Sequence, residues 1–246
     1  MNKNERFRLI LSLLNQRKYL SVEELSRLVY VSPSTLRRDL AEMSRSGYLM
    51  RSRGGAMALA PGEAEDTIIH QTSAVLSLDQ TAIVRKAAEF LRDGDIVYLD
   101  ASSLVLGMAP FLKARRRLTL VTHSLQWGLV LPEGRHRLIC LGGELSARNL
   151  SVTGQQCVQT AARFNYRIGF FSCSGISNGQ VTCHNLNTAA LLSCVMDHTE
   201  ESILLCSREK ITRVTAVNAV PLDRFTRIIT NSPEGFEKMG DRVIRV

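Results

Sequence analysis

The sequence predicts two domains, a small helical domain at the N-terminus and a larger α/β domain built on a doubly wound parallel sheet. Apolar residues repeat at helical spacing through residues 7–43, a stretch without periodicity follows, and short apolar runs then alternate with helical stretches. The 246 residues, 45% of them hydrophobic, are enough for buried cores in both domains. A disordered chain is therefore excluded.

The first two helices are predicted by spacing and by a capping motif. Apolar residues at i, i+3, i+4 and i+7 give the first helix one buried stripe: Phe7, Ile10, Leu11 and Leu14. Ser21 and Glu24 have the spacing of a capping box, which predicts the start of a second helix. We expect Leu25 and Leu28 to supply the buried face of that helix.

A third helix is predicted to begin at Pro33, after Ser32 as its N-cap. Its spacing turns Leu36, Leu40 and Met43 inward. The same spacing points four polar residues outward near the N-terminal half of the helix: Ser34, Thr35, Arg37 and Arg38. In a helix-turn-helix unit this half of the recognition helix meets base edges, and Arg, Ser and Thr are suited to contact bases or phosphates.

A wing is predicted after the third helix. Arg51 and Arg53 lie two residues apart, so they share one face of a strand, and Gly54 and Gly55 then form a turn. On a winged helix-turn-helix such arginines are placed for phosphates or the minor groove. They are solvated strand charges if no nucleic acid binds.

The positive charge of the chain is concentrated in this segment. Residues 1–55 hold 11 Lys or Arg against 5 Asp or Glu, a net charge of +6, whereas residues 56–246 have a net charge of +2. A basic excess on a helix-turn-helix unit favours double-stranded DNA as the partner, because neutralising phosphates dominates nucleic-acid affinity. A three-helix unit that contacts only protein is the alternative.

Three motifs of this domain resemble the DeoR family of bacterial regulators. They are residues 32–40 (SPSTLRRDL), residues 47–49 (GYL) and residues 53–56 (RGGA). The family usually has His-Gly-Gly-Ala in the last motif, so Arg53 is a departure that keeps a phosphate-contacting group.

The rest of the chain has the pattern of a parallel α/β domain. Apolar runs at 96–99, 118–121, 138–141, 168–171 and 203–206 predict strands, and residues 81–91, 104–112 and 188–196 predict helices. Residues 57 to about 75 lack periodicity. We therefore expect a DNA-binding domain over 1–57, a linker over 58–75 and a sensor domain over 76–246.

Polar residues follow three of these strands, where sheets of this class collect ligands. The first loop offers Asp100, Ser102 and Ser103, the second His123 and Ser124, and the third Gly142 and Gly143. Hydroxyls and backbone amides there are suited to phosphate or sugar oxygens. Ordinary helix capping explains each loop equally well, because Ser and Thr begin many helices.

The family resemblance extends through the second domain, to about residue 230. It implies a fold related to sugar-phosphate isomerases and a phosphorylated sugar as effector, with Asp100, Ser102 and Ser103 in the phosphosugar loop and Gly142 and Gly143 opposite. Lys210 matches the family lysine. Four positions depart from the family's polar anchors: Arg167, Thr188, Leu192 and Ser207. We therefore expect an altered effector, with Arg167 either pairing with an anionic group of that effector or lying outside the pocket.

Two other functions stay open. A sugar-phosphate isomerase-like enzyme needs a general base, for which Asp100, Glu144 and His123 are the nearest residues, although none lies in a recognisable catalytic motif. A second domain that only oligomerises is the other possibility, and a homo-oligomer is expected in either case. We expect a cytoplasmic protein without cofactor, metal site or membrane segment, because the cysteines are scattered and no long apolar run occurs.

Overall fold

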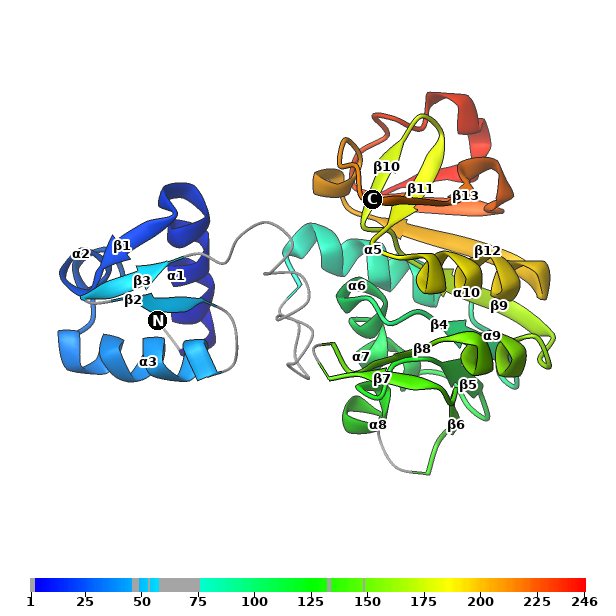
Figure 1. Cartoon of the computed structure of the whole chain (residues 1–246), viewed down its shortest axis with the longest axis horizontal. Helices are drawn as coiled ribbons and strands as arrows, with labels where there is room; N and C mark the ends of the chain where they lie inside the picture. The colour runs from blue at the N-terminus through cyan, green and yellow to red at the C-terminus, as the bar shows by residue number, and fades with distance from the viewer. Residues whose placement is uncertain (1–2, 46–48, 53, 58–75, 132–133, 148) are drawn as a thin grey trace. The chain divides into compact units, whose positions relative to one another are not determined.

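The chain divides into two compact units, Met1–Gln71 and Thr72–Val246. The computed structural model (Figure 1) describes residues 3–45, 49–52, 54–57, 76–131, 134–147 and 149–246. The predicted linker at 58–75 and the predicted wing residue Arg53 lie outside the described residues. No helix in the described ranges combines the length and the apolar character needed to cross a membrane.

The N-terminal unit is a winged helix-turn-helix. Its elements are α1 (Lys3–Arg17), β1 (Tyr19–Ser21), α2 (Val22–Leu28), α3 (Pro33–Arg45), β2 (Met50–Ser52) and β3 (Gly55–Met57). The three short strands pair antiparallel in the order β1-β3-β2. The predicted capping box is confirmed, because the Ser21 hydroxyl accepts the Glu24 N–H and the Glu24 carboxylate accepts the Ser21 N–H.

The predicted apolar stripes form the core of this unit. Its fully buried members include Ile10, Leu14, Leu25, Leu36, Leu40 and Met43. The prediction that Leu28 is buried is wrong, since its side chain is 38% exposed. Helix α2 ends at Leu28, and Val29 in the following turn is buried in its place.

An ion pair joins α1 to α3 across this core. Arg6 Nε donates to Asp39 Oδ2 over 2.6 Å, and the two side chains are only 14% and 7% exposed. The hydrogen bond to Asp39 raises the pKa of the Arg6 guanidinium, so Arg6 stays charged in the fold. The pair fixes the helix that carries the predicted DNA-reading residues.

The larger unit is built on seven parallel strands in the order β15-β14-β12-β9-β4-β5-β6. They are β4 (Ile96–Leu99), β5 (Thr119–Thr122), β6 (Arg137–Cys140), β9 (Tyr166–Phe171), β12 (Thr199–Cys206), β14 (Arg227–Thr230) and β15 (Val243–Arg245). This confirms the predicted parallel sheet. From β4 the chain adds β5 and β6 on one side and later places β9 and β12 on the other.

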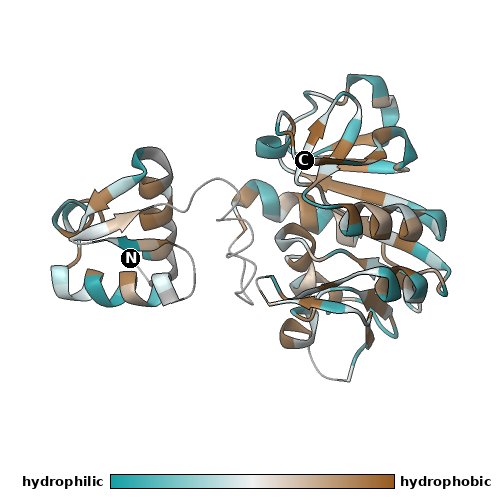
Figure 2. Cartoon of the chain, in the orientation of Figure 1, coloured by the Kyte–Doolittle hydropathy of each residue, from teal (hydrophilic) through white to brown (hydrophobic). Residues whose placement is uncertain are grey.

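Helices cover both faces of the sheet, as a doubly wound fold requires. One face packs against α5 (Leu78–Ala88), α6 (Ser103–Leu106), α7 (Ala109–Leu112) and α8 (Trp127–Val130). The other packs against α9 (Gln155–Ala161) and α10 (Leu186–Asp197) (Figure 1). The strands between them are mostly hydrophobic (Figure 2), because a sheet covered on both faces exposes neither set of alternating side chains.

Two features of this unit differ from the expectations. The single helix predicted over 104–112 is two helices, α6 and α7, because Pro110 has no N–H for a continuous helical ladder. Two small sheets were not predicted. One is the hairpin of β7 (Glu144–Ser146) and β8 (Ser151–Thr153); the other joins β10 (Gly175–Ser177), β11 (Gln180–Cys183) and β13 (Val217–Pro221).

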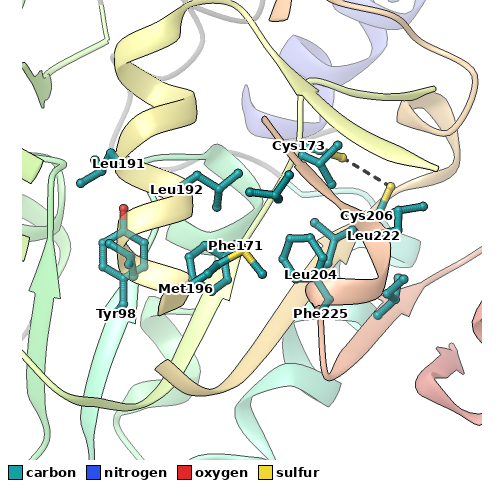
Figure 3. Close-up of a cluster of buried hydrophobic side chains, with 14 of the residues drawn as sticks. Tyr98, Phe171, Cys173, Leu191, Leu192, Met196, Leu204, Cys206, Leu222 and Phe225 are labelled. Atoms are coloured by element: carbon teal, nitrogen blue, oxygen red, sulfur yellow. Dashed lines mark hydrogen bonds between the residues drawn. The ribbon is translucent and has the colours of Figure 1, made fainter. Parts of the chain in front are cut away.

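The core beneath α10 holds aromatic rings and two thiols. Figure 3 shows Tyr98, Phe171 and Phe225 among aliphatic side chains, with the Cys173 and Cys206 sulfurs 3.7 Å apart. All six cysteines lie in described ranges and none forms a disulfide. Burial raises the pKa of the Cys157 thiol to about 11, which keeps it protonated at neutral pH.

A buried tyrosine and histidine join β4 to the loop after β5. The Tyr98 hydroxyl and His123 Nδ1 are 2.8 Å apart, and the two rings stack with centroids 6.1 Å apart. Burial lowers the pKa of His123, while the Asp100 carboxylate, 3.7 Å from Nε2, acts in the opposite direction. His123 is therefore neutral in the fold near pH 7.

Replacing Asp39 with alanine is expected to destabilise the N-terminal unit by about 3–5 kcal/mol, because it leaves the buried Arg6 charge without its partner. The one tryptophan, Trp127, lies in the larger unit. Circular dichroism of Asp39→Ala in urea should show an early transition, while tryptophan fluorescence keeps its wild-type midpoint. Glu89→Ala, which breaks the exposed Lys86–Glu89 pair, is the control and should cost at most about 1 kcal/mol. An unchanged circular dichroism curve for Asp39→Ala would contradict this role.

The neutral state of His123 makes the larger unit less stable in mild acid. In the unfolded chain a histidine titrates near about 6.5, above its lowered pKa in the fold, so the unfolded state binds more protons and stability falls as pH drops below about 6.5. Melting followed by Trp127 fluorescence between pH 7.5 and 5.5 should show this fall, and His123→Gln should reduce it. The exposed His184 provides a matched control, His184→Gln. Equal pH slopes for His123→Gln and wild type would rule out this account, and NMR titration of the wild-type imidazole checks it independently.

Candidate functional site

The outer face of α3 presents the residues that the sequence predicts for DNA. Ser34, Arg37 and Arg38 are exposed, whereas Thr35 is half-buried. The Ser32 hydroxyl accepts the Thr35 N–H over 3.2 Å and lies 2.9 Å from the Ser34 and Thr35 hydroxyls. The first turn of α3 is thus capped by hydroxyls, and the two arginines extend from its second turn.

The wing adds Arg51 to the same unit. Arg51 is exposed on β2 and pairs with Ala56 on β3. The turn between these strands uses Gly54 in the left-handed region, at φ +82°. Gly55 has a different reason to be glycine, since a Cβ there would lie 2.4 Å from the Leu20 carbonyl oxygen. The glycine pair is therefore required by the backbone of the wing.

The exposed arginines differ from Arg6 in their electrostatic environment. Within the described part of the chain Arg37, Arg38 and Arg51 form no ion pair, while Arg6 is paired with Asp39. An exposed arginine without an ion pair keeps all of its donors for a ligand, and its planar group suits phosphates and guanine edges. This face can therefore bind a polyanion.

In the larger unit polar residues gather where the strand order reverses, at the switch point where doubly wound sheets have their ligand crevice. Asp100 follows β4 and Ser172 follows β9, and these adjacent strands belong to the two halves of the sheet. Asp100 Oδ2 accepts the Ser172 N–H over 3.1 Å, and Oδ1 accepts the Ala101 N–H over 2.7 Å. Backbone amides thus hold the carboxylate at the topological switch point, where ligands of doubly wound sheets bind.

Ser172 is a site residue that the sequence analysis missed. Its hydroxyl is buried and, among the described residues, has no hydrogen-bond partner. An unsatisfied buried hydroxyl costs about 1–3 kcal/mol, so it indicates a missing partner such as a ligand or a water. The signal that identifies it is spatial, because residue 172 meets residue 100 only through the pairing of β9 with β4.

Three predicted effector residues border this crevice. Asp100, Ser102 and Ser103 are half-buried, so part of each side chain is accessible. The Ser102 hydroxyl already accepts the Val105 N–H as the cap of α6. Among the described residues the Ser103 hydroxyl makes no hydrogen bond, which leaves it for a ligand.

His123 and Ser124 lie behind this border. Both are buried, at 5% and 1% exposed. The Ser124 hydroxyl accepts the Gln126 N–H over 3.4 Å, and Ser124 bridges to Ser151 of β8. Their hydrogen bonds shape the loop after β5, so the geometry gives them a positioning role rather than a first contact.

The remaining predicted residues lie farther out along the same edge. Gly142 follows β6 and is exposed, while Gly143 packs so closely on β8 that a Cβ would lie 2.4 Å from the Thr153 carbonyl oxygen. Lys210 follows β12 and is half-buried. Four strand spacings separate β6 from β12, which is about 19 Å, too far for one phosphate to touch both ends.

Arg167 does not lie at this edge. It is the second residue of β9, at the amino end of the strand, where it pairs with Asp95 over 2.7 Å and Glu201 over 3.0 Å. Its guanidinium also donates to the Phe90 carbonyl oxygen. The idea that Arg167 pairs with an effector is therefore wrong, because the residue stabilises the opposite edge of the sheet.

The crevice is suited to bind hydroxyl groups. The Asp100 carboxylate is a hydrogen-bond acceptor held in place by backbone N–H groups, and Ser103 and Ser172 add hydroxyls that can both donate and accept hydrogen bonds. In the described residues no three His, Cys, Asp or Glu side chains are grouped to hold a metal ion. The arrangement can therefore recognise a polar, hydroxylated small molecule through hydrogen bonds.

Known proteins match the chain in both units. Residues 6–61 match the DeoR-like helix-turn-helix domain, and residues 78–232 match the DeoR C terminal sensor domain. The chain is 26% identical over 235 residues to the glycerol-3-phosphate regulon repressor of Escherichia coli strain K12, which covers 95% of this chain and 92% of that protein. It is 28% identical over 250 residues to the uncharacterized HTH-type transcriptional regulator YulB of Bacillus subtilis strain 168, covering 98% and 95%.

Among solved structures, ribose 5-phosphate isomerase A from Methanocaldococcus jannaschii is similar with a TM-score of 0.36 and 11% identity, over 54% of this chain and 53% of that one. The family matches confirm the resemblance seen in the motifs of α3 and the wing. With both domain types present in this order, the chain belongs to the DeoR family and is a DNA-binding transcriptional regulator with a C-terminal sensor domain.

Proposed function

We propose that this regulator is a repressor whose affinity for operator DNA changes when a phosphorylated sugar or related polyol binds beside Asp100. The observation that carries the proposal is at the switch point, where the Asp100 carboxylate accepts the Ser172 N–H and the buried Ser172 hydroxyl has no hydrogen-bond partner among the described residues. The relative named as a glycerol-3-phosphate regulon repressor supports a phosphorylated polyol as the class of effector.

In this proposal the N-terminal domain reads DNA with α3 and the wing. Base edges or phosphates contact the N-terminal half of α3 through Ser34, Thr35, Arg37 and Arg38, and phosphates or the minor groove contact Arg51 and Arg53. The exposure of the α3 and β2 arginines supports this assignment. The domains keep the predicted limits: 1–57 for DNA, 58–75 as linker and 76–246 as sensor.

The effector in this proposal contacts Asp100, Ser102, Ser103 and Ser172. His123 and Ser124 position the loop behind it, and Gly142, Gly143 and Lys210 border the outer rim. Thr188 and Leu192 of α10 and Ser207 after β12 supply no charge to the sensor domain. Recognition therefore depends on hydroxyl contacts more than on charged anchors, which favours an effector with several free hydroxyls.

The regulator is proposed to act in the cytoplasm as a homo-oligomer, without cofactor, metal or catalytic turnover. Binding of symmetric half-sites needs paired helix-turn-helix domains, and the larger domain is the part available to pair them. An isomerase-like enzyme is the weaker candidate, because His123 is buried and hydrogen-bonded to Tyr98.

The test is recovery of genomic DNA fragments by the purified full chain at a stated salt concentration, with and without a pool of cellular metabolites. Enrichment of one repeated motif that is lost with metabolites supports both halves of the proposal. Enrichment that stays the same when metabolites are added contradicts the proposal that the larger domain senses an effector. Absence of sequence-selective binding contradicts the repressor.

Arg37→Ala and Arg38→Ala are each expected to weaken operator binding. A base-reading arginine contributes about 1–3 kcal/mol of discrimination, and a phosphate-contacting arginine changes the salt slope by about 1. Fluorescence anisotropy with the recovered operator and a scrambled duplex, at several salt concentrations, separates the two roles. Arg92→Ala in the larger domain is the control. Wild-type affinity in both α3 variants would overturn the assignment of this face.

Ser103→Arg is expected to abolish the ligand response while leaving unliganded DNA binding intact, because the long side chain occupies the crevice border. The probes are ribose 5-phosphate, fructose 6-phosphate and glycerol 3-phosphate, read by thermal shift and by release of operator DNA. Ser172→Ala should melt no lower than wild type, since it removes an unpaired buried hydroxyl, yet respond less to the probe. Thr212→Arg adds the same charge at an exposed position as a control. A full response in Ser103→Arg would exclude this crevice.

A further inference from the structure

Tyr30 is an unusual residue in the turn between α2 and α3. Its side chain is 91% exposed, the largest exposed fraction among the exposed large hydrophobic residues described. Its backbone is in the left-handed region, at φ +54°. Neither burial nor local backbone preference accounts for tyrosine here, because glycine or asparagine adopts this conformation at lower cost.

The neighbouring residues explain why the turn exists but not why it carries an aromatic ring. Val29 is fully buried, and the Val31 N–H and carbonyl group both bond to Ser26, through its carbonyl oxygen and its hydroxyl. These contacts fix the backbone on both sides of Tyr30. They hold its side chain outward, immediately before the first turn of α3.

Exposed arginines flank this turn along the chain, on the helix before it and on the helix after it. Arg27 lies three residues before Tyr30 and is exposed, and Arg37 and Arg38 extend from the next helix. A strained residue that persists without a packing role is a candidate for function. Tyrosine hydroxyls are among the groups that form hydrogen bonds to DNA phosphates. The turn lies directly before the N-terminal end of α3, and this is the end of a recognition helix that contacts base edges in the major groove.

We infer that the Tyr30 hydroxyl donates a hydrogen bond to a DNA phosphate beside the recognition helix, so that Tyr30 is a DNA-contacting residue of this regulator. The inference rests on DNA binding by α3. A phosphate contact carries no sequence information, so it strengthens binding to every duplex and fixes the register of α3 in the groove. Because the phenol is uncharged, it releases no counterion.

The test compares Tyr30→Phe, Tyr30→Gly and Tyr19→Phe in the full chain, with the recovered operator and a scrambled duplex. Tyr30→Phe keeps the ring and removes one neutral hydrogen bond, which predicts a loss of affinity of about 3- to 10-fold on both duplexes with an unchanged salt slope. Tyr30→Gly should bind at least as weakly while melting no lower than wild type, because glycine relieves the positive φ. Tyr19 is a second exposed tyrosine of the same unit and should tolerate phenylalanine without effect.

Arg37→Ala, measured beside these variants, separates failure of this inference from failure of DNA reading by α3. If Arg37→Ala binds weakly while both Tyr30 variants bind within twofold of wild type, the Tyr30 contact is excluded and the recognition face stands. If Arg37→Ala and Arg38→Ala both bind like wild type, the recognition face itself is misassigned and the inference falls with it. A lower melting temperature for Tyr30→Gly, or an altered oligomer size in solution, would show that the ring packs on protein and would also overturn the inference.

Discussion

The pairing of β4 with β9 is the constraint on which the larger domain depends. These strands are separated by a long stretch of chain, yet they lie side by side at the centre of the sheet, with Val97 opposite Ile168 and Leu99 opposite Phe170. Because all seven strands are parallel, their carboxyl ends meet at one edge. The strand order reverses between β4 and β9, where Asp100 and Ser172 meet, and the proposed ligand site lies at this switch point.

Asp100 shows how the backbone prepares this crevice. A carboxylate at the edge of a hydrophobic sheet is costly unless its charge is satisfied, and two backbone N–H groups, from Ala101 and Ser172, do this from two different strands. The carboxylate therefore joins the two halves of the sheet while keeping acceptor capacity for a ligand. The same arrangement buries the Ser172 hydroxyl, which has no hydrogen-bond partner among the described residues, so local stability is lower than it would be with an apolar residue there. A cost of this kind at a switch point is typical of a binding site.

The fold was predicted from the sequence mainly where the signal is local, although one local signal was missed, and poorly where it depends on distant pairing. Two helical features depend only on residues within two turns of each other: the stripe through Ile10 and Leu14, and the capping box of Ser21 and Glu24. They can therefore be predicted without knowing the fold. The apolar runs of the sheet are equally clear, because strands covered on both faces are continuously hydrophobic. The missed signal is the two-residue turn Asn178–Gly179, which joins β10 and β11 into a tight hairpin. The pairing of β11 with β13 depends instead on residues far apart in the sequence.

The candidate sites follow the same division. The face of α3 was predicted because helical spacing alone separates Leu36 and Leu40 from Arg37 and Arg38. Asp100, Ser102 and Ser103 were predicted as effector residues from their place after a strand, and all three follow β4 as half-buried residues. Ser172 was missed and the place of Arg167 was left open for one reason. Whether a residue in or next to β9 lies at the ligand edge depends on the end of the strand at which it lies. Sequence similarity to a family aligns such positions, but it does not show which of them meet in space.

The buried pair of Tyr98 and His123 extends the crevice into the core. Asp100 lies 3.7 Å from His123, whose ring is held by the Tyr98 hydroxyl, and the Tyr98 ring packs against Tyr166 and Phe171. All of these aromatic rings face α9 and α10 rather than α5 to α8. A ligand that shifts Asp100 changes the field on a buried neutral imidazole, where charges interact more strongly than in water. In the described part of the chain, the polar contacts that run from this carboxylate through His123 to Tyr98 lead to the side of the sheet under α9 and α10, so this is the side on which such a ligand is expected to act.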